Sequence, residues 1–164
     1  MSVDTIERIN AYFKANVEDV INVFTIYKNV NEDIPEPTGG PFINLWVEPS
    51  LDTLLSDGGN YQEDGIIIAQ VYIEQGESSL ELHSVMDTIK TAFRQLQLQP
   101  TSTDIGTIAI KDIELSNSGT VTTESYGSNI SWRKWDLFLT YSKYECNVVV
   151  APSAEQRNFT TFNA

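Results

Sequence analysis

The sequence contains one histidine and one cysteine, and these two residues limit the catalytic chemistry that it could perform. His83 could act as a general base with Glu81 or Asp87 nearby, but no nucleophile or orienting partner accompanies it. Cys146 has neither a histidine nor a helix N-terminus beside it that would activate its thiol. We therefore interpret His83 as a helix-surface or interface residue and Cys146 as a structural residue, and we expect no enzyme.

The sequence motifs of phosphate, metal and hydrolytic sites are missing from the chain. It has no GxSxG, Walker, HExxH or CxxC sequence, and its glycine pairs at 39–40 and 58–59 indicate turns. The acidic pairs Glu32-Asp33 and Glu63-Asp64 show neither the ligand spacing of a calcium loop nor a partner at the distance that glycoside hydrolysis needs. We expect no catalytic residue, no metal and no cofactor.

One cluster, Trp132-Arg133-Lys134-Trp135, combines basic and aromatic side chains. Trp and Arg are enriched at protein interfaces, so this cluster could anchor a contact between chains. The tryptophans could equally pack at a strand end, and Trp46 or Trp132 could stack on a sugar ring or a base. The residues alone leave these alternatives open.

The charge of the chain is its most unusual bulk property. The 23 acidic and 10 basic residues give a net charge of −13. Residues 1–89 hold 16 acids and three bases and so carry the whole −13, whereas residues 90–164 hold seven of each. Specific nucleic-acid binding needs clustered Lys and Arg, which makes it a poor interpretation. The distribution predicts a molecule with one acidic and one neutral side.

The length of 164 residues and the hydrophobic fraction of 41% predict one folded domain. We expect residues 1–145 to form it and 146–164 to be a C-terminal extension that is either loosely ordered or ordered by a partner. No apolar stretch approaches the roughly 20 residues that a membrane span needs, and the N-terminus does not resemble a signal peptide. We therefore expect no membrane partner.

Two helices are predicted. In the first, Asp4 and Glu7 have the spacing of a capping box, and the helix is expected to fray near Asn16. In the second, Ser78 is the predicted N-cap, and Pro100 follows the end of the helix. The apolar stripe of this second helix steps by four and three residues through Leu82, Met86, Ile89, Phe93 and Leu96.

Strands are predicted at 20–28, 42–48, 65–73, 107–116 and 130–144, with 65–73 as the central one. Residues 29–41 are predicted to be a loop, and 49–64 a second long loop or a flared hairpin tip. The phase change at Lys111-Asp112 predicts a bulge or two short strands, and 117–119 a turn. The fold class is α+β: a mixed or antiparallel sheet of about four to five strands flanked by two α-helices.

This series of elements resembles the tail terminator proteins of long-tailed bacteriophages, the lambda-type tail-end family. The resemblance covers about 12–145 and rests on DTIERINAYF, PFINLWVE, GIIIAQVYIEQ leading into LELHSVMDTIKTAF, IKDIELSNSG and WRKWDLFLTYSKYE. The loops 29–41 and 49–64 and the segment after Glu145 depart from the family pattern.

The resemblance implies a structural protein of the virion tail or neck, made in the host cytoplasm. Such proteins form a homo-hexameric ring on the tail tube protein, stop tube polymerisation and present a surface to the head-completion or neck protein, while DNA passes through without specific binding. On this resemblance we expect two sets of contact residues. Candidates for the lumen or tube face are Glu32, Asp33, Glu36, Asp57, Glu63 and Asp64. Candidates for contacts between protomers are Trp132, Arg133, Lys134 and Trp135.

Two other classes stay open. Another phage neck or tail-tube component would look similar but would stack into tubes. A monomeric α+β ligand-binding module, with Trp46 or Trp132 against a carbohydrate, would bind a small molecule and would not form rings.

Overall fold

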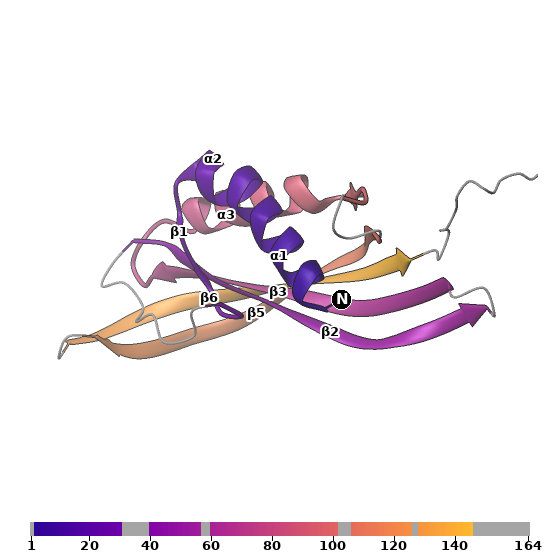
Figure 1. Ribbon diagram of the computed structural model, residues 1–164. Helices are drawn as coiled ribbons and strands as arrows, with labels where there is room; N and C mark the ends of the chain where they lie inside the picture. Colours follow the sequence, from indigo (N-terminus) through magenta and orange to yellow (C-terminus); the bar gives the residue numbers. More distant parts are fainter. Residues whose placement is uncertain (1, 31–39, 57–59, 102–105, 126–127, 146–164) are drawn as a thin grey trace, which may run out of the picture.

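The structure is a computed structural model and describes residues 2–30, 40–56, 60–101, 106–125 and 128–145. It is an α+β fold in which the helices lie on one face of a twisted sheet (Figure 1). The elements in chain order are α1 (Ser2–Phe13), the π-helical turn η1 (Lys14–Glu18), α2 (Asp19–Ile21), β1 (Phe24–Tyr27), β2 (Phe42–Ser56), β3 (Asn60–Glu74), α3 (Ser79–Phe93), β4 (Gln97–Leu98), β5 (Thr107–Ser125) and β6 (Ser128–Glu145).

The six strands of the described chain form one sheet in the order β1-β2-β3-β6-β5-β4. Only β1 and β2 pair in parallel, and every other neighbouring pair is antiparallel. The sheet is therefore mixed, as expected, but has more strands than the four to five predicted. The two-residue strand β4 was missed because so short a segment has no apolar period. The prediction of 65–73 as the central strand is confirmed, since β3 lies between β2 and β6.

The predicted strand at 20–28 is wrong in its first part. The helical segment does not fray at Asn16 but continues through η1 and α2 to Ile21, and Asn22, at φ 56, ends it. Val17 is fully buried in the core, so packing of the helix overrides the strand preference of the β-branched residues that follow. At the other end the helix begins at Ser2, so Asp4 lies in its first turn instead of at the N-cap.

Of the two alternatives predicted for residues 49–64, a long loop or a hairpin tip, the hairpin is confirmed. Both β2 and β3 are 15 residues long, and they pair out to Ser56 and Asn60, with register shifts after Pro49 and Leu54. The predicted bulge at Lys111-Asp112 is also confirmed by a register shift between Ile110 and Asp112. The predicted turn at 117–119 is wrong, because β5 shifts register there and continues to Ser125.

The second helix begins as predicted, since the Ser78 side chain accepts a hydrogen bond from the backbone N–H of Leu80 at 3.2 Å. It ends earlier than predicted, at Phe93, and Gln95 adopts φ 55. Leu96 therefore lies outside the helix, although it still packs against the core. The predicted loop at 29–41 and the predicted extension at 146–164 lie largely or wholly outside the described residues.

The main core lies between the helices and the sheet. Alternate residues of β3, namely Ile67, Ala69, Val71 and Ile73, face the helices and are buried with Ile9, Phe13, Val17, Met86, Ile89 and Phe93. On the opposite face a small second cluster consists of Ile26, Phe42, Tyr72 and Trp132. No helix of the described chain covers that second face (Figure 1), which we call the open face of the sheet.

Gly65 is required at its position by a close approach. An added Cβ would lie 2.4 Å from the hydroxyl oxygen of Tyr141, the buried residue opposite it on β6. We expect Gly65→Ala to lower the free energy of unfolding by about 1–3 kcal/mol, because the buried ring cannot move away without repacking. Urea denaturation would measure this loss. The double variant with Tyr141→Leu is the control, and it should recover part of the loss; no recovery would contradict the steric explanation.

Candidate interaction surfaces

Two neighbouring acids of the predicted lumen set lie on opposite faces of β3. Glu63 faces the helices and is buried, and its carboxylate accepts a hydrogen bond from the Thr5 hydroxyl of α1 at 3.1 Å. It lies opposite Lys143, which is also buried and whose Nζ is 3.4 Å from the Glu145 carboxylate. Burial inside the protomer leaves Glu63 no surface for a lumen or a tube.

Asp64 lies on the open face and is exposed. Its carboxylate accepts hydrogen bonds from the Ser142 hydroxyl at 2.5 Å and from the Gln62 amide at 2.8 Å. These donors, Ser142 first, lower the pKa of Asp64 below its ordinary value. The structure thus leaves Asp64 available for a contact. The other four acids of the set, Glu32, Asp33, Glu36 and Asp57, lie outside the described residues, and their role stays a prediction.

A polar network extends from Asp64 along the open face. Lys111, at the bulge of β5, donates a hydrogen bond to the Tyr144 hydroxyl at 3.0 Å. The hydrogen bond from Lys111, followed by that of Ser142, lowers the pKa of Tyr144. No local sequence pattern indicates this network, because its members come from three different strands, β3, β5 and β6. Together these side chains form a polar surface on the open face of the sheet.

Trp132 is fully buried, in contrast to the predicted contact between protomers. Its ring makes an edge contact with Phe42, with centroids 4.9 Å apart, and Phe42 stacks on Tyr72 at 4.4 Å. The alternative that it packs at a strand end agrees with this position. An indole without exposed surface can bind neither a neighbouring chain nor a sugar.

The other three residues of the basic and aromatic cluster are half-buried and alternate between faces. Arg133 donates to the backbone carbonyl of Glu77 at 2.7 Å, beside the start of α3. Lys134 lies on the open face, 3.6 Å from the Asp136 carboxylate. Trp135 packs against the main core, with its ring centroid 5.9 Å from that of His83. The cluster is therefore not one surface, since alternation along β6 divides it.

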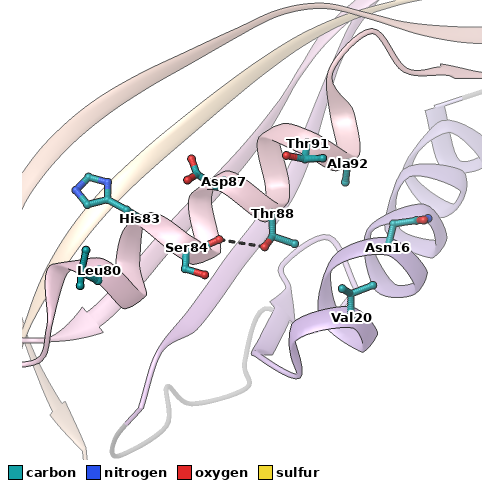
Figure 2. Close-up of a pocket in the computed structure, with 9 residues that line it drawn as sticks. All are labelled: Asn16, Val20, Leu80, His83, Ser84, Asp87, Thr88, Thr91 and Ala92. Carbon is teal, nitrogen blue, oxygen red and sulfur yellow. Dashed lines mark hydrogen bonds between the residues drawn. The ribbon is translucent and has the colours of Figure 1, made fainter.

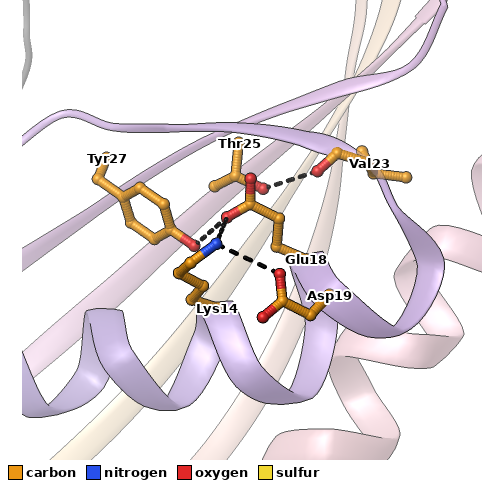
Figure 3. Close-up of polar contacts among 6 residues, drawn as sticks. All are labelled: Lys14, Glu18, Asp19, Val23, Thr25 and Tyr27. Carbon is orange, nitrogen blue, oxygen red and sulfur yellow. Dashed lines mark hydrogen bonds and ion pairs between the residues drawn. The ribbon is translucent and has the colours of Figure 1, made fainter.

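The acids near β1 are partly neutralised within the chain (Figure 3). Glu18 accepts a hydrogen bond from the Tyr27 hydroxyl at 2.7 Å, and Lys14 Nζ lies 3.9 Å from Glu18 and 3.3 Å from Asp19. Burial, followed by the hydrogen bond to Glu18, raises the pKa of Tyr27 well above its ordinary value. The hydrogen bond between Tyr27 and Glu18 links β1 to η1, and we therefore assign these residues a role in stabilising the fold.

A groove of about 590 Å³ lies between α3 and the end of the first helical segment (Figure 2). Val20 and Leu80, both largely exposed, lie on its two sides, and His83 and Asp87 project from α3. No serine, threonine or cysteine in this groove is hydrogen-bonded to His83 among the contacts of the described chain. His83 is exposed, as predicted for a helix-surface residue.

The described residues contain no group of three or more His, Cys, Asp or Glu side chains that could hold a metal ion. Among the same residues, no helix has the length and apolar character needed to cross a membrane.

Comparison with known proteins identifies a likeness of fold. No family model and no curated protein matches the sequence. One of the solved structures that resemble the chain has a TM-score of 0.52 and 18% sequence identity, and the match covers 88% of this chain and 96% of the other. At this identity the likeness shows a shared fold alone. Function must therefore be argued from the surfaces.

The hydrogen bonds of Asp64 should have a measurable effect on its pKa. We expect Ser142→Ala to raise the pKa of Asp64 toward its ordinary value, because the first of the two donors is lost. The stability that Asp64 contributes is present above the unfolded pKa of about 3.9 and is lost as pH falls through the lower folded value. The variant should therefore differ most from wild type above that range.

Carboxyl NMR shifts followed against pH would measure the pKa of Asp64 directly. Gln62→Ala is the matched control, since it removes the weaker of the two donors and should raise the pKa less. Equal pKa values in wild type and Ser142→Ala would contradict the assignment.

Proposed function

We propose that this chain is a tail terminator, the protomer of a homo-hexameric ring that caps the tail tube of a long-tailed bacteriophage. On this proposal the ring stops polymerisation of the tail tube protein and offers the docking surface for the head-completion or neck protein. DNA passes through it without specific binding. The protein works as a structural component of the virion, assembled in the host cytoplasm.

The observation that carries the proposal is the placement of charge across the sheet. The strands β1, β2 and β3 hold five acids and no base, whereas β6, β5 and β4 hold five acids and four bases. The two lateral sides of the protomer therefore differ in charge. Unlike sides favour head-to-tail association, and head-to-tail contacts whose rotation closes generate rings.

The excess of acid also supports a passage for DNA. A ring of protomers with net charge −13 repels phosphates, so a duplex would not adhere to its wall. The order of helix, parallel strand, long hairpin, helix and second long hairpin agrees with the element series on which the family resemblance rests. These two observations support a structural role and do not depend on any single residue.

The proposal predicts a ring at the end of the tail tube. Adding the purified chain to polymerising tail tube protein should give short tubes, each with one extra annulus at one end, in negative-stain electron micrographs. The tube protein alone is the control and should give longer tubes without that annulus. Stacked layers of this chain would instead indicate a tube component, and tubes without annuli would overturn the proposal.

A second prediction concerns the acids expected at the lumen or tube face. The triple substitution Glu32→Lys, Asp33→Lys and Glu36→Lys should lower infectious titre by about tenfold or more, because added cations bind phosphate. Glu77→Lys with Glu81→Lys, one exposed residue just before α3 and one in its first turn, is the control for added positive charge elsewhere on the chain. Equal titres for the triple variant and wild type would contradict the prediction that these three acids face the lumen or the tube.

A further inference from the structure

A second groove lies on the helix side of the sheet, between α3 and β5. It has a volume of about 300 Å³ and is lined by Lys90 of α3, by Arg94 directly after the end of α3, and by Ile110, Asp112 and Ile113 of β5. The helices do not cover it because α1 packs mainly over β2, and α3 over β3. The helix side of β5 beyond its short pairing with β4 is thus only partly covered. We call this surface the α3–β5 groove.

The floor of the groove is apolar and continues along β5. Ile113 and Leu115 lie opposite Leu139 and Leu137 of β6, on the face that the helices cover elsewhere. Ile113 is half-buried, whereas Leu115 is 43% exposed. Such a row of apolar side chains beside a helix can accommodate a further helix.

The wall of the groove is basic at one end. Arg94 is exposed at the end of α3, and Lys90 is one turn before it, 3.4 Å from the Asp87 carboxylate. Lys111 also lines the groove, although its ammonium group reaches the Tyr144 hydroxyl. These three bases belong to the neutral part of a chain whose first half is strongly acidic.

A complementary surface exists on the same chain. The exposed side of α1 consists of Val3, Glu7 and Ala11, spaced four residues apart and so aligned on one face of the helix. Val3 is 65% exposed. This stripe has a carboxylate between two apolar residues, and the groove has cations beside an apolar floor.

We propose that the α3–β5 groove receives the Val3, Glu7 and Ala11 stripe of α1 from a second copy of this chain. The inference rests on the proposed ring, because groove and stripe are different surfaces and their contact is head-to-tail. In this contact Glu7 of one copy lies near Arg94 of the next, while Val3 and Ala11 cover Ile113 and Leu115. The apolar floor favours this occupant over a nucleic-acid phosphate, which would leave Ile113 and Leu115 in contact with water.

Photo-crosslinking from Leu115 tests the contact. Benzoylphenylalanine would replace Leu115 in the chain. Isotopically light and heavy preparations of this variant would then be mixed and allowed to form rings, either in solution or on tail tubes. We expect mixed light and heavy crosslinks to a peptide that contains residues 3–11. Rings that crosslink only elsewhere or only within one chain would overturn the docking assignment and leave the ring intact. Absence of any ring or crosslinked pair would overturn both this inference and the proposed function.

A charge exchange gives an independent readout. Arg94→Glu and Glu7→Arg should each weaken self-association about tenfold in sedimentation velocity, because each places like charges together. The double variant should recover association close to wild type, and Glu81→Arg, on another face of α3, should leave it unchanged. Failure of the double variant to recover, with all variants folded by circular dichroism, would overturn the pairing. Binding of a short DNA duplex that Arg94→Glu abolishes would assign the groove to phosphate instead.

Discussion

The register between β3 and β6 is the constraint on which the placement of most other side chains depends. It runs without a shift from Tyr61 opposite Glu145 to Glu74 opposite Trp132. Since successive strand residues face opposite sides, this one frame buries Glu63 under α1 and leaves Asp64 on the open face. A slip by one residue would exchange the two faces, expose the helix-side core and bury the polar network. The apolar residues from Ile67 to Ile73 make such a slip costly.

Much of the fold could be predicted from sequence wherever a pattern was strong and local. Short stretches of sequence were enough to predict four features: the apolar stripe of α3, its Ser78 cap, the central strand β3 and the bulge after Ile110. The predictions of secondary structure were wrong where contacts between distant segments determine the conformation of the chain. Val17 is buried because η1 packs into the core, where it contacts α3, and this packing extends a helix through residues that favour strands. The outer part of β5 has no apolar period and is held by pairing with β6.

The candidate surfaces were harder to predict, because a sequence shows only the order of the charged residues along the chain. Their positions in space depend on the order of the strands and on the face of the sheet that each residue takes. The asymmetry between the two halves of the chain was visible, but only the strand order shows that it becomes an asymmetry from side to side. Burial of Glu63, Trp132 and Lys143 depends on which face each residue takes. The polar network on the open face depends on hydrogen bonds between distant residues, namely Lys111 with Tyr144, 33 positions apart, and Ser142 with Asp64, 78 positions apart.

The π-helical turn at Lys14–Glu18 has a consequence for how this chain can change in length. Such a turn holds one residue more than an α-helical turn does, while the helix on either side keeps its packing. Loss of the exposed Ala15 would leave Phe13 and Val17 three positions apart in place of four, still on one side of the helix. Relatives one residue shorter here could therefore keep the same core, and alignments that forbid a gap inside this helix would misplace every residue before it.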